Sequence, residues 1–226
     1  MRAVHARRYD VTGCRVREDF SVTISADESG WERRRSLLQA KYEQIAWDLF
    51  AKHGFRDVTV EEIAEVSGVS ARTLFRYFPV KEDFLLGFTR RGLQTLVNLI
   101  AELEPSPDPV RSVWQLIRTH SLQDPQDVRL LTLWRRAAAD APEIHARVRG
   151  ERMQALTEAV TDYCAKSKGD AAPEDPEPRV LAGVVVGAEM AVIELWGRSA
   201  LGLHEIFEAA EAAVPNLAQK RRGRRP

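Results

Sequence analysis

The sequence contains only two cysteines, Cys14 and Cys164, and they stand far apart in the chain. Because there is no CxxC pair, we predict neither a disulfide framework nor a thiolate metal site, and we expect both residues to be free thiols. No apolar run is as long as a membrane span, and the first residues, MRAVHARRYDVTGCRVRED, lack the apolar core of a signal peptide. We therefore expect a cytoplasmic protein with no membrane partner.

The motifs of the common enzyme classes are missing as well. The chain has no HExxH, no GxSxG, no P-loop and no dinucleotide fingerprint, and its histidines do not show metal-ligand spacing. We therefore predict a protein with no catalytic residues, no metal and no cofactor. An enzyme whose site is assembled from distant residues is the less favoured alternative.

What the sequence does contain is enough material for a folded core and an uneven distribution of charge. Its 226 residues, 44% of them hydrophobic and 29% charged, suit one or two domains. The net charge is zero, yet arginines crowd the first 17 residues and the chain ends on KRRGRRP, residues 220–226. This basic tail either keeps the protein soluble or lies along DNA, where its cations would neutralise phosphates.

Apolar residues recur at three- and four-residue spacing along almost the whole chain, which predicts an all-α fold. A first helix with one apolar face is expected to end at Gly54 through a left-handed cap. Its apolar face consists of Leu38, Tyr42, Ile45, Ala46, Leu49 and Phe50. Thr59 and Glu62 form a capping box, which predicts that a second helix starts at Val60.

The segment VEEIAEVSGVSARTLFRYF, residues 60–78, predicts two short helices on either side of Gly68, with Ser70 as the cap of the second. The first of them would turn its apolar side inward through Val60, Ile63, Ala64 and Ser67. The second would place two sets on opposite arcs: Ala71, Leu74, Phe75 and Phe78 inward, and Arg72, Thr73, Arg76 and Tyr77 outward. This pattern matches a helix-turn-helix, whose second helix enters the major groove of DNA. The alternative is a helical hairpin with a solvated basic face.

The longer stretch YEQIAWDLFAKHGFRDVTVEEIAEVSGVSARTLFRYFPVKEDFLLGF resembles the DNA-binding domain of TetR-family transcriptional regulators. Its segments LF…HGF, VTVEEIAEVSGVS, LFRYF and KEDFL fall at the spacing of that family. The resemblance implies two sets of DNA-binding residues. Those expected to contact phosphates are Thr59, Tyr77 and Lys81, and those expected to contact bases are Ala71, Arg72, Thr73 and Arg76. Ser70 is also expected to be a DNA-binding residue. Phe75 stands where the family often has a tyrosine whose hydroxyl meets a phosphate, so that contact is not expected here.

Beyond residue 92, breaks at 104–109, 123–127, 140–143, 168–178 and near Gly202 predict about five more helices. The resemblance implies that they form a body that binds an effector and dimerises through its last two long helices, here roughly 179–199 and 203–217. Gly183 and Gly187 would let a partner helix approach closely. The expected organisation is an N-terminal arm (1–30), whose order is open, a DNA-binding domain (31–92), the helical body (93–219) and the basic tail.

Five residues are candidates for an effector site: Trp114, Trp134, Arg135, Glu189 and Trp196. For any single tryptophan a place in the core is the favoured alternative, and Arg135 can pair with Glu189 or hold an acidic group of the ligand. The sequence thus leads to the hypothesis of a homodimeric, sequence-specific DNA-binding regulator. It would be a repressor, released from a palindromic operator by a small, largely apolar effector. A chromosome-associated division regulator that binds DNA is the alternative.

Overall fold

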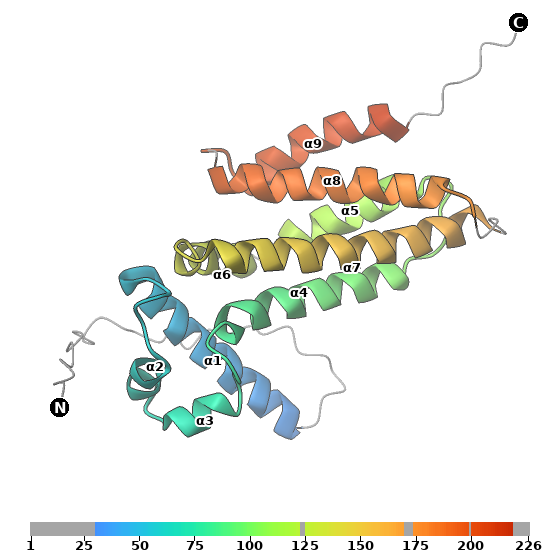
Figure 1. Cartoon of the computed structure of the whole chain (residues 1–226). Coiled ribbons are helices and arrows are strands. Elements are labelled where there is room, and N and C mark those ends of the chain that lie inside the picture. The colour runs from blue at the N-terminus through green and yellow to red at the C-terminus, as the bar shows by residue number, and fades with distance from the viewer. Residues whose placement is uncertain (1–29, 123–124, 170–173, 199, 219–226) are drawn as a thin grey trace, which may run out of the picture. The chain divides into compact units, whose positions relative to one another are not determined.

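The computed structural model describes residues 30–122, 125–169, 174–198 and 200–218, and within these ranges it consists of helices without a strand (Figure 1). The predicted all-α fold is confirmed. The helices are α1 (Gly30–His53), α2 (Val60–Ser67), α3 (Ala71–Phe75), α4 (Asp83–Ala101), α5 (Pro109–Leu122), α6 (Pro125–Ala137), α7 (Pro142–Lys168), α8 (Glu177–Arg198) and α9 (Leu203–Ala218). The expectations for the arm before Gly30 and for the basic tail lie outside the described residues.

The chain forms two compact units, and each takes residues from two separate stretches of the sequence. Among the described residues, unit 1 comprises those up to Phe88 together with Leu130–Ile144, and unit 2 comprises those within Thr89–Arg129 and from His145 onward. The expected division into contiguous domains at residue 92 differs from this arrangement. The end of α6 and the turn before α7 belong with the N-terminal helices, because side chains of that segment bond to them.

The core of unit 1 forms around α1, whose predicted apolar face is buried at Tyr42, Ile45, Ala46, Leu49 and Phe50. The indole nitrogen of Trp47 donates a buried hydrogen bond of 2.6 Å to the carbonyl of Phe84, at the start of α4. The ring of Phe84 stacks on Phe78, with 4.0 Å between the ring centroids. Aromatic packing and one buried hydrogen bond therefore hold the first turn of α4 against α1.

A second indole holds the same turn from α6. The side chain of Trp134 is buried, and its Nε1 donates a hydrogen bond of 2.7 Å to the carbonyl of Leu85. A buried indole N–H needs an acceptor, and this carbonyl supplies one. The hydrogen bond explains why the end of α6 belongs to unit 1.

Unit 2 contains a continuous apolar core contributed by α4, α5, α7, α8 and α9. Within unit 2, α8 packs along α9, and α5 contacts both of them (Figure 1). The core includes Leu96, Ile100, Val113, Trp114, Ile117, Leu156, Val160, Tyr163, Val185, Val186 and Phe207. Cys164 also lies here as a free thiol, as expected, and burial raises its pKa to about 11. It is therefore a packed apolar group at neutral pH and a poor nucleophile.

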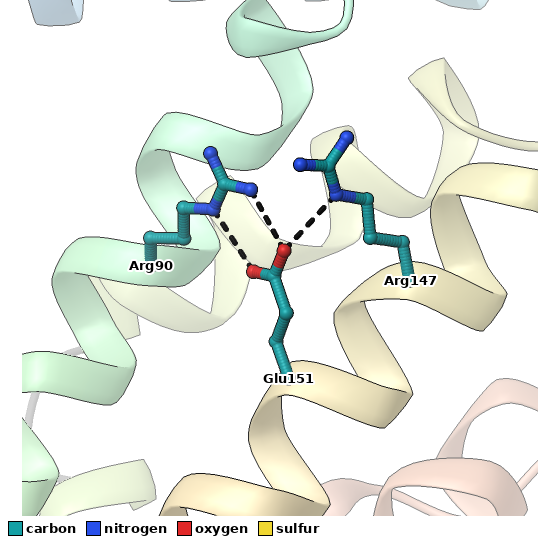
Figure 2. A network of polar contacts seen from close by, with 3 residues as sticks. All are labelled: Arg90, Arg147 and Glu151. Atoms are coloured by element: carbon teal, nitrogen blue, oxygen red, sulfur yellow. Dashed lines mark hydrogen bonds and ion pairs between the residues drawn. The ribbon is translucent and has the colours of Figure 1, made fainter.

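Within unit 2, α4 and α7 are joined by a network of two arginines and one glutamate, shown in Figure 2. Arg90 binds both carboxylate oxygens of Glu151, through Nε to Oε2 at 2.9 Å and Nη2 to Oε1 at 2.7 Å. Arg147, one turn before Glu151 on α7, adds a contact of 3.0 Å from Nε to Oε1. The bidentate geometry makes this a stronger pair than a single surface contact.

We expect this network to make stability depend on pH in the acid range. The hydrogen bonds and charges of Arg90 and Arg147 lower the pKa of Glu151 from 4.5 to about 2. Because the folded-state pKa is below the unfolded value, the stabilisation is fully present above pH 4.5 and is lost as the pH falls through about 2. Glu151→Gln should lower the free energy of unfolding by about 1 kcal/mol at pH 7.

Urea denaturation at pH 7, 4 and 2.5 measures this effect. The difference between Glu151→Gln and the unaltered protein should shrink as the pH falls. Glu158→Gln is the matched control, because Glu158 is exposed on the same helix and its hydrogen-bond partner is the neutral amide of Gln154. A difference for Glu151→Gln that is equally large at pH 7 and pH 2.5 contradicts the prediction.

Candidate nucleic-acid interface

The start of α2 is held by the predicted capping box. Thr59 Oγ1 accepts a hydrogen bond of 3.2 Å from the amide of Glu62, and Glu62 Oε2 accepts one of 2.7 Å from the amide of Thr59. The threonine hydroxyl also donates to Glu62 Oε2 at 3.1 Å. The two residues thus satisfy amides that would otherwise be free at the helix start. Thr59 remains exposed, so its side chain is accessible to a phosphate.

The turn between α2 and α3 depends on Gly68, which has the left-handed conformation with φ of 68°. Its amide donates to the carbonyls of Ala64 and Glu65 and closes the end of α2. Ser70 then caps α3: its Oγ accepts from the amide of Thr73 at 3.2 Å and lies 2.9 Å from Thr73 Oγ1. The predicted cap at Ser70 is present, and Gly68 closes the end of α2, so the end of the first helix and the start of the second are defined.

The two helices turn their apolar sides inward, with one exception. Val60, Ile63 and Ala64 of α2 are buried. On the inward side of α3 and the turn that follows it, Leu74 and Phe78 are buried. The expectation that Phe75 also faces inward is wrong, because its side chain is 43% exposed. Leu74 and Phe78 are four residues apart and share one face, whereas Phe75 lies about 100° away around the helix from Leu74.

On the outward side of this segment, Arg72 and Arg76 are exposed, and Thr73 and Tyr77 are partly exposed. Ala71, which was expected to face inward, is partly exposed as well. The ring of Tyr77 packs edge-on against Tyr42 of α1, with 5.5 Å between centroids, and the guanidinium of Arg76 lies 6.0 Å from its centroid. The ring of Tyr77 therefore packs against α1 and lies near the guanidinium of Arg76. All of these side chains belong to one unit, so their arrangement is determined by its own core.

Arg35, on α1, joins this group although the sequence analysis did not single it out. Its guanidinium carbon lies 6.0 Å from the ring centroid of Tyr77 and 5.6 Å from that of Trp31. The side chain is exposed, as are those of its neighbours Arg33 and Arg34. The run of three arginines was the signal available in the sequence. Its placement beside Tyr77 required the packing of α1 against the end of α3.

Lys81 lies in the turn that leads into α4, and its side chain folds back over unit 1. Its Nζ is 4.5 Å from the ring centroid of Phe55 and contacts the carbonyl oxygen of Arg56 at 3.5 Å. Burial lowers the pKa of Lys81, and the neighbouring carboxylates offset part of this effect. The ammonium is therefore held in one place by an aromatic face and a carbonyl, and the side chain remains partly exposed.

The turn between α1 and α2 is bound by Asp140, which lies between α6 and α7 in the same unit. Its carboxylate accepts from the amides of Phe55 at 2.9 Å and Arg56 at 3.3 Å. Burial raises the pKa of Asp140, but the hydrogen bonds from these two amides lower it more, so it lies below its usual value. Gly54 allows this approach: its φ is 91°, and a Cβ atom there would be 3.0 Å from Asp140 Oδ2.

We expect Gly54→Ala to lower the free energy of unfolding by about 1–3 kcal/mol, from left-handed strain and from crowding against Asp140. Gly68→Ala is the matched comparison, because Gly68 also has a positive φ but a Cβ there meets nothing within 4 Å. It should therefore lose only the strain energy. The two variants are compared by urea denaturation at pH 7. Equal losses would mean that the contact with Asp140 has no energetic weight.

The five candidate effector residues separate between the two units. Trp134 and Arg135 belong to unit 1, whereas Trp114, Glu189 and Trp196 belong to unit 2. Trp114 is buried in the core of unit 2, and Trp196 packs against that core. Pairing with Glu189 was one of the two uses considered for Arg135, but the structure pairs Glu189 with Arg152 of α7, at 2.6 Å from Nη2 to Oε1. Glu194 pairs with Arg198 on its own helix.

Comparison with known proteins identifies both parts of the chain. Residues 44–87 match the family described as bacterial regulatory proteins, tetR family, and residues 118–219 match the MftR C-terminal domain. The chain is 29% identical over 188 residues to the Mycobacterium tuberculosis protein MftR, covering 81% of this chain and 92% of that one. The chain belongs to the TetR family. It is accordingly a DNA-binding transcriptional regulator, and its relatives are regulators and not enzymes.

Other transcriptional regulators match less of the chain or share only its fold. RutR of Escherichia coli is 29% identical over 153 residues, covering 64% of this chain and 71% of that one. A solved TetR-family regulator from Syntrophomonas wolfei superposes with a TM-score of 0.61 at 18% identity, covering 81% of this chain and 95% of that one. Within the described ranges, no helix is both long enough and apolar enough to span a membrane, and no cluster of side chains suits a metal ion.

Proposed function

We propose that this TetR-family protein is a repressor that binds a pseudo-palindromic operator as a homodimer and leaves it when a small effector binds unit 2. The observation that carries the proposal is the outward side of the segment 71–77, where Arg72 and Arg76 are exposed on a helix that Ser70 caps at its start and Arg76 at its end. Fixed caps matter because base readout requires side chains at defined positions. One helix-turn-helix reads one face of the groove, so two copies should need half-sites about one helical turn apart.

The division of labour within this surface follows from the chemistry of the side chains. Arginine can donate two hydrogen bonds to O6 and N7 of guanine, so Arg72 and Arg76 are proposed to read bases. A threonine methyl can contact the methyl of thymine, which suits Thr73, and Ala71 leaves room for the groove edge. The proposed phosphate ligands are Thr59, Ser70, Tyr77 and Lys81. These contacts would fix the register and carry no sequence information.

Arg35 is added to the proposed phosphate ligands because of its place beside Tyr77. An exposed guanidinium held between two aromatic rings loses little conformational freedom when it binds an anion. The residues Arg35, Arg76 and Tyr77 therefore bring two cations and one hydroxyl to the same side of unit 1. In binding assays Arg35→Ala should weaken specific and random DNA alike, as expected for a phosphate contact.

The proposed dimer interface is the outer face of α8, with α9 beside it. The face combines small residues with exposed apolar ones: Val180, Gly183, Gly187, Ala191 and Leu195. Val180 is 62% exposed and Leu195 is 54% exposed, which is unusual for large apolar side chains in a protein with ample core. The small residues between them allow a partner helix to approach closely, as helix packing requires. A second copy of the same face would cover the exposed apolar groups.

The proposed effector site lies in unit 2, in the core that contains Trp114 and Glu189 and against which Trp196 packs. Trp134 and Arg135 are left out of it, since Trp134 already bonds to Leu85 in unit 1. α4 is a single helix that begins in unit 1 and continues in unit 2. A ligand that shifts the part of α4 in unit 2 would thereby change the position of its first turn and separate the two recognition helices.

The effector and the operator should oppose each other by the same factor. If the effector lowers operator affinity tenfold, linkage requires that operator DNA lowers effector affinity tenfold. A compound found by a thermal-shift screen is titrated calorimetrically into the free protein and into the operator complex, and operator affinity is measured with and without it. Equal affinity for the free and DNA-bound protein contradicts the proposed release mechanism.

The regulated genes can be found by genome-wide footprinting of the protein. The name of the Mycobacterium tuberculosis relative assigns it to transcriptional regulation of mycofactocin biosynthesis. The promoter regions of genes of that pathway are therefore the first places to test for an operator. A small number of promoter sites with one palindromic sequence is the expected result.

The second candidate function is that of a division regulator, suggested by the nucleoid occlusion factor SlmA of Vibrio campbellii. SlmA is 32% identical over 104 residues, covering 44% of this chain and 51% of that one. Many scattered sites would favour this candidate.

A further inference from the structure

Glu189 is a carboxylate placed where the pattern of α8 calls for an apolar residue. The buried face of this helix runs through Ala182, Val185, Val186 and Val192, and Glu189 falls in the same register. Its side chain is fully buried. A buried carboxylate loses its hydration, so it needs donors from the protein or from a ligand.

The protein supplies donors to only one of the two carboxylate oxygens. Both contacts from Arg152 end on Oε1, at 2.8 Å from Nε and 2.6 Å from Nη2. The other oxygen, Oε2, is buried and has no hydrogen-bond partner among the described residues. This is not the arrangement of the Arg90–Glu151 pair, in which Arg90 serves both oxygens. Glu189 thus has one oxygen paired with arginine and one acceptor left over.

Among the residues described, unit 2 also contains two donor atoms without a partner, although one of them belongs to Arg118, whose Nη1 pairs with Glu211 Oε2 at 3.1 Å. Trp114 Nε1 and Arg118 Nε, one turn apart on α5, are buried and lack a hydrogen-bond partner within the described residues. α5 contacts α8 in unit 2, and Trp114 belongs to the same buried cluster as Val185, Val186 and Val192. Native interiors leave few such groups unpaired, so the unpaired Glu189 Oε2, together with the unpaired indole of Trp114 in the same unit, points to a bound molecule that completes them.

We infer that the effector carries a neutral hydrogen-bond donor, a hydroxyl or an amide N–H, on an apolar chain, and that this donor binds Glu189 Oε2. The inference rests on the proposed effector site in unit 2 and specifies its ligand chemistry. Glu189 and Arg152 together have no net charge. An ammonium ligand would add an uncompensated positive charge to the core, and a carboxylate ligand would bring a second anion to Glu189. A neutral donor supplies the missing bond and adds no charge.

Four probes with an eight-carbon chain, or its equivalent in length, separate these possibilities by calorimetry on the full-length protein without DNA. They are octan-1-ol, heptyl methyl ether, octylammonium and octanoate. The ether has the same number of heavy atoms as the alcohol and an acceptor oxygen, but no donor. A hydrogen bond to a charged group predicts that the alcohol binds roughly 10- to 100-fold more tightly than the ether. The two charged probes should also bind more weakly than the alcohol.

Glu189→Gln tests the acceptor directly. If Arg152 keeps its bonds to the carbonyl oxygen of the new amide side chain, the NH2 group of that amide faces the ligand. It can then donate to alcohol and ether alike, so the preference for alcohol should disappear. Glu194→Gln is the matched control on the same helix, because Glu194 is half exposed and pairs with Arg198 one turn away. It should retain the full preference. Circular dichroism melting checks that both variants are folded.

The comparison of alcohol with ether on the unaltered protein needs no variant, so the inference can be tested even if Glu189→Gln does not fold. Equal binding of the two probes, no binding of any of the four, or an undiminished alcohol preference in folded Glu189→Gln would each overturn it. The proposed function is tested separately, by the DNA-binding assays. If a ligand of other chemistry triggers release from the operator, the proposed function stands and only the inferred ligand chemistry is wrong.

Discussion

Replacing Arg72 or Arg76 by alanine is expected to lower the affinity for the specific operator by about 1–3 kcal/mol and to relax the preference at one base pair. Both side chains are exposed on the outward side of the segment 71–77, which is proposed to read the bases, whereas Leu74 and Phe78 are buried and hold the segment in place. Removing an exposed guanidinium leaves this packing intact. The loss should therefore appear in DNA binding and not in the melting temperature. Binding-site selection followed by fluorescence anisotropy measures both affinity and preference.

Lys81→Ala provides the contrasting case, since a phosphate ligand should weaken all sequences alike. Lys81 also contacts the ring of Phe55 and the carbonyl of Arg56, so the melting temperature of this variant must be measured beside its affinity. The expected pattern is a change of base preference for the two arginines and a uniform loss for the lysine. If both Arg72→Ala and Arg76→Ala keep the operator affinity and the base preference of the unaltered protein, this segment does not read the bases as proposed.

Gly187→Leu is expected to convert the proposed dimer into a monomer and to lower operator affinity at least 100-fold, roughly the loss of cooperative binding to two half-sites. Gly187 lies on the exposed face of α8, and a Cβ atom there meets nothing within 4 Å in the same chain. Leucine is also a better helix former than glycine, so the isolated chain should become more stable. Any loss of association must then come from a clash with the partner helix.

Gly150→Leu is the control for this experiment, because Gly150 is an exposed helical glycine on α7 whose added Cβ also meets nothing within 4 Å. It should leave the mass and the operator affinity unchanged. Light scattering after size-exclusion chromatography gives the mass of each variant, and titration with full and half operators gives the affinity. A dimeric Gly187→Leu with unaltered operator binding would show that this face of α8 is not the interface.

The local features of the DNA-binding unit could be read from the chain because each depends on residues only a few positions apart. The capping box of Thr59 and Glu62, the cap at Ser70 and the left-handed end of α1 at Gly54 involve neighbours within four residues. Helix caps and turns are governed by local backbone geometry, which specific residue types satisfy. The apolar face of α1 followed from the same periodicity. Phe75 was wrongly predicted to face inward because helical periodicity groups residues by their angle around the helix alone. It does not show how wide an arc of the helix the core covers.

The sequence by itself thus determined the helices, their ends and the family, while tertiary structure decided which distant side chains meet. Asp140 binds the amides of Phe55 and Arg56 across more than 80 residues, and Trp134 bonds to Leu85 across 49. These bonds place the end of α6 in unit 1, against the contiguous division expected from the chain. Glu189 likewise found Arg152 instead of Arg135. Such pairs depend on how whole helices pack, and packing is a property of many side chains together that no short pattern contains.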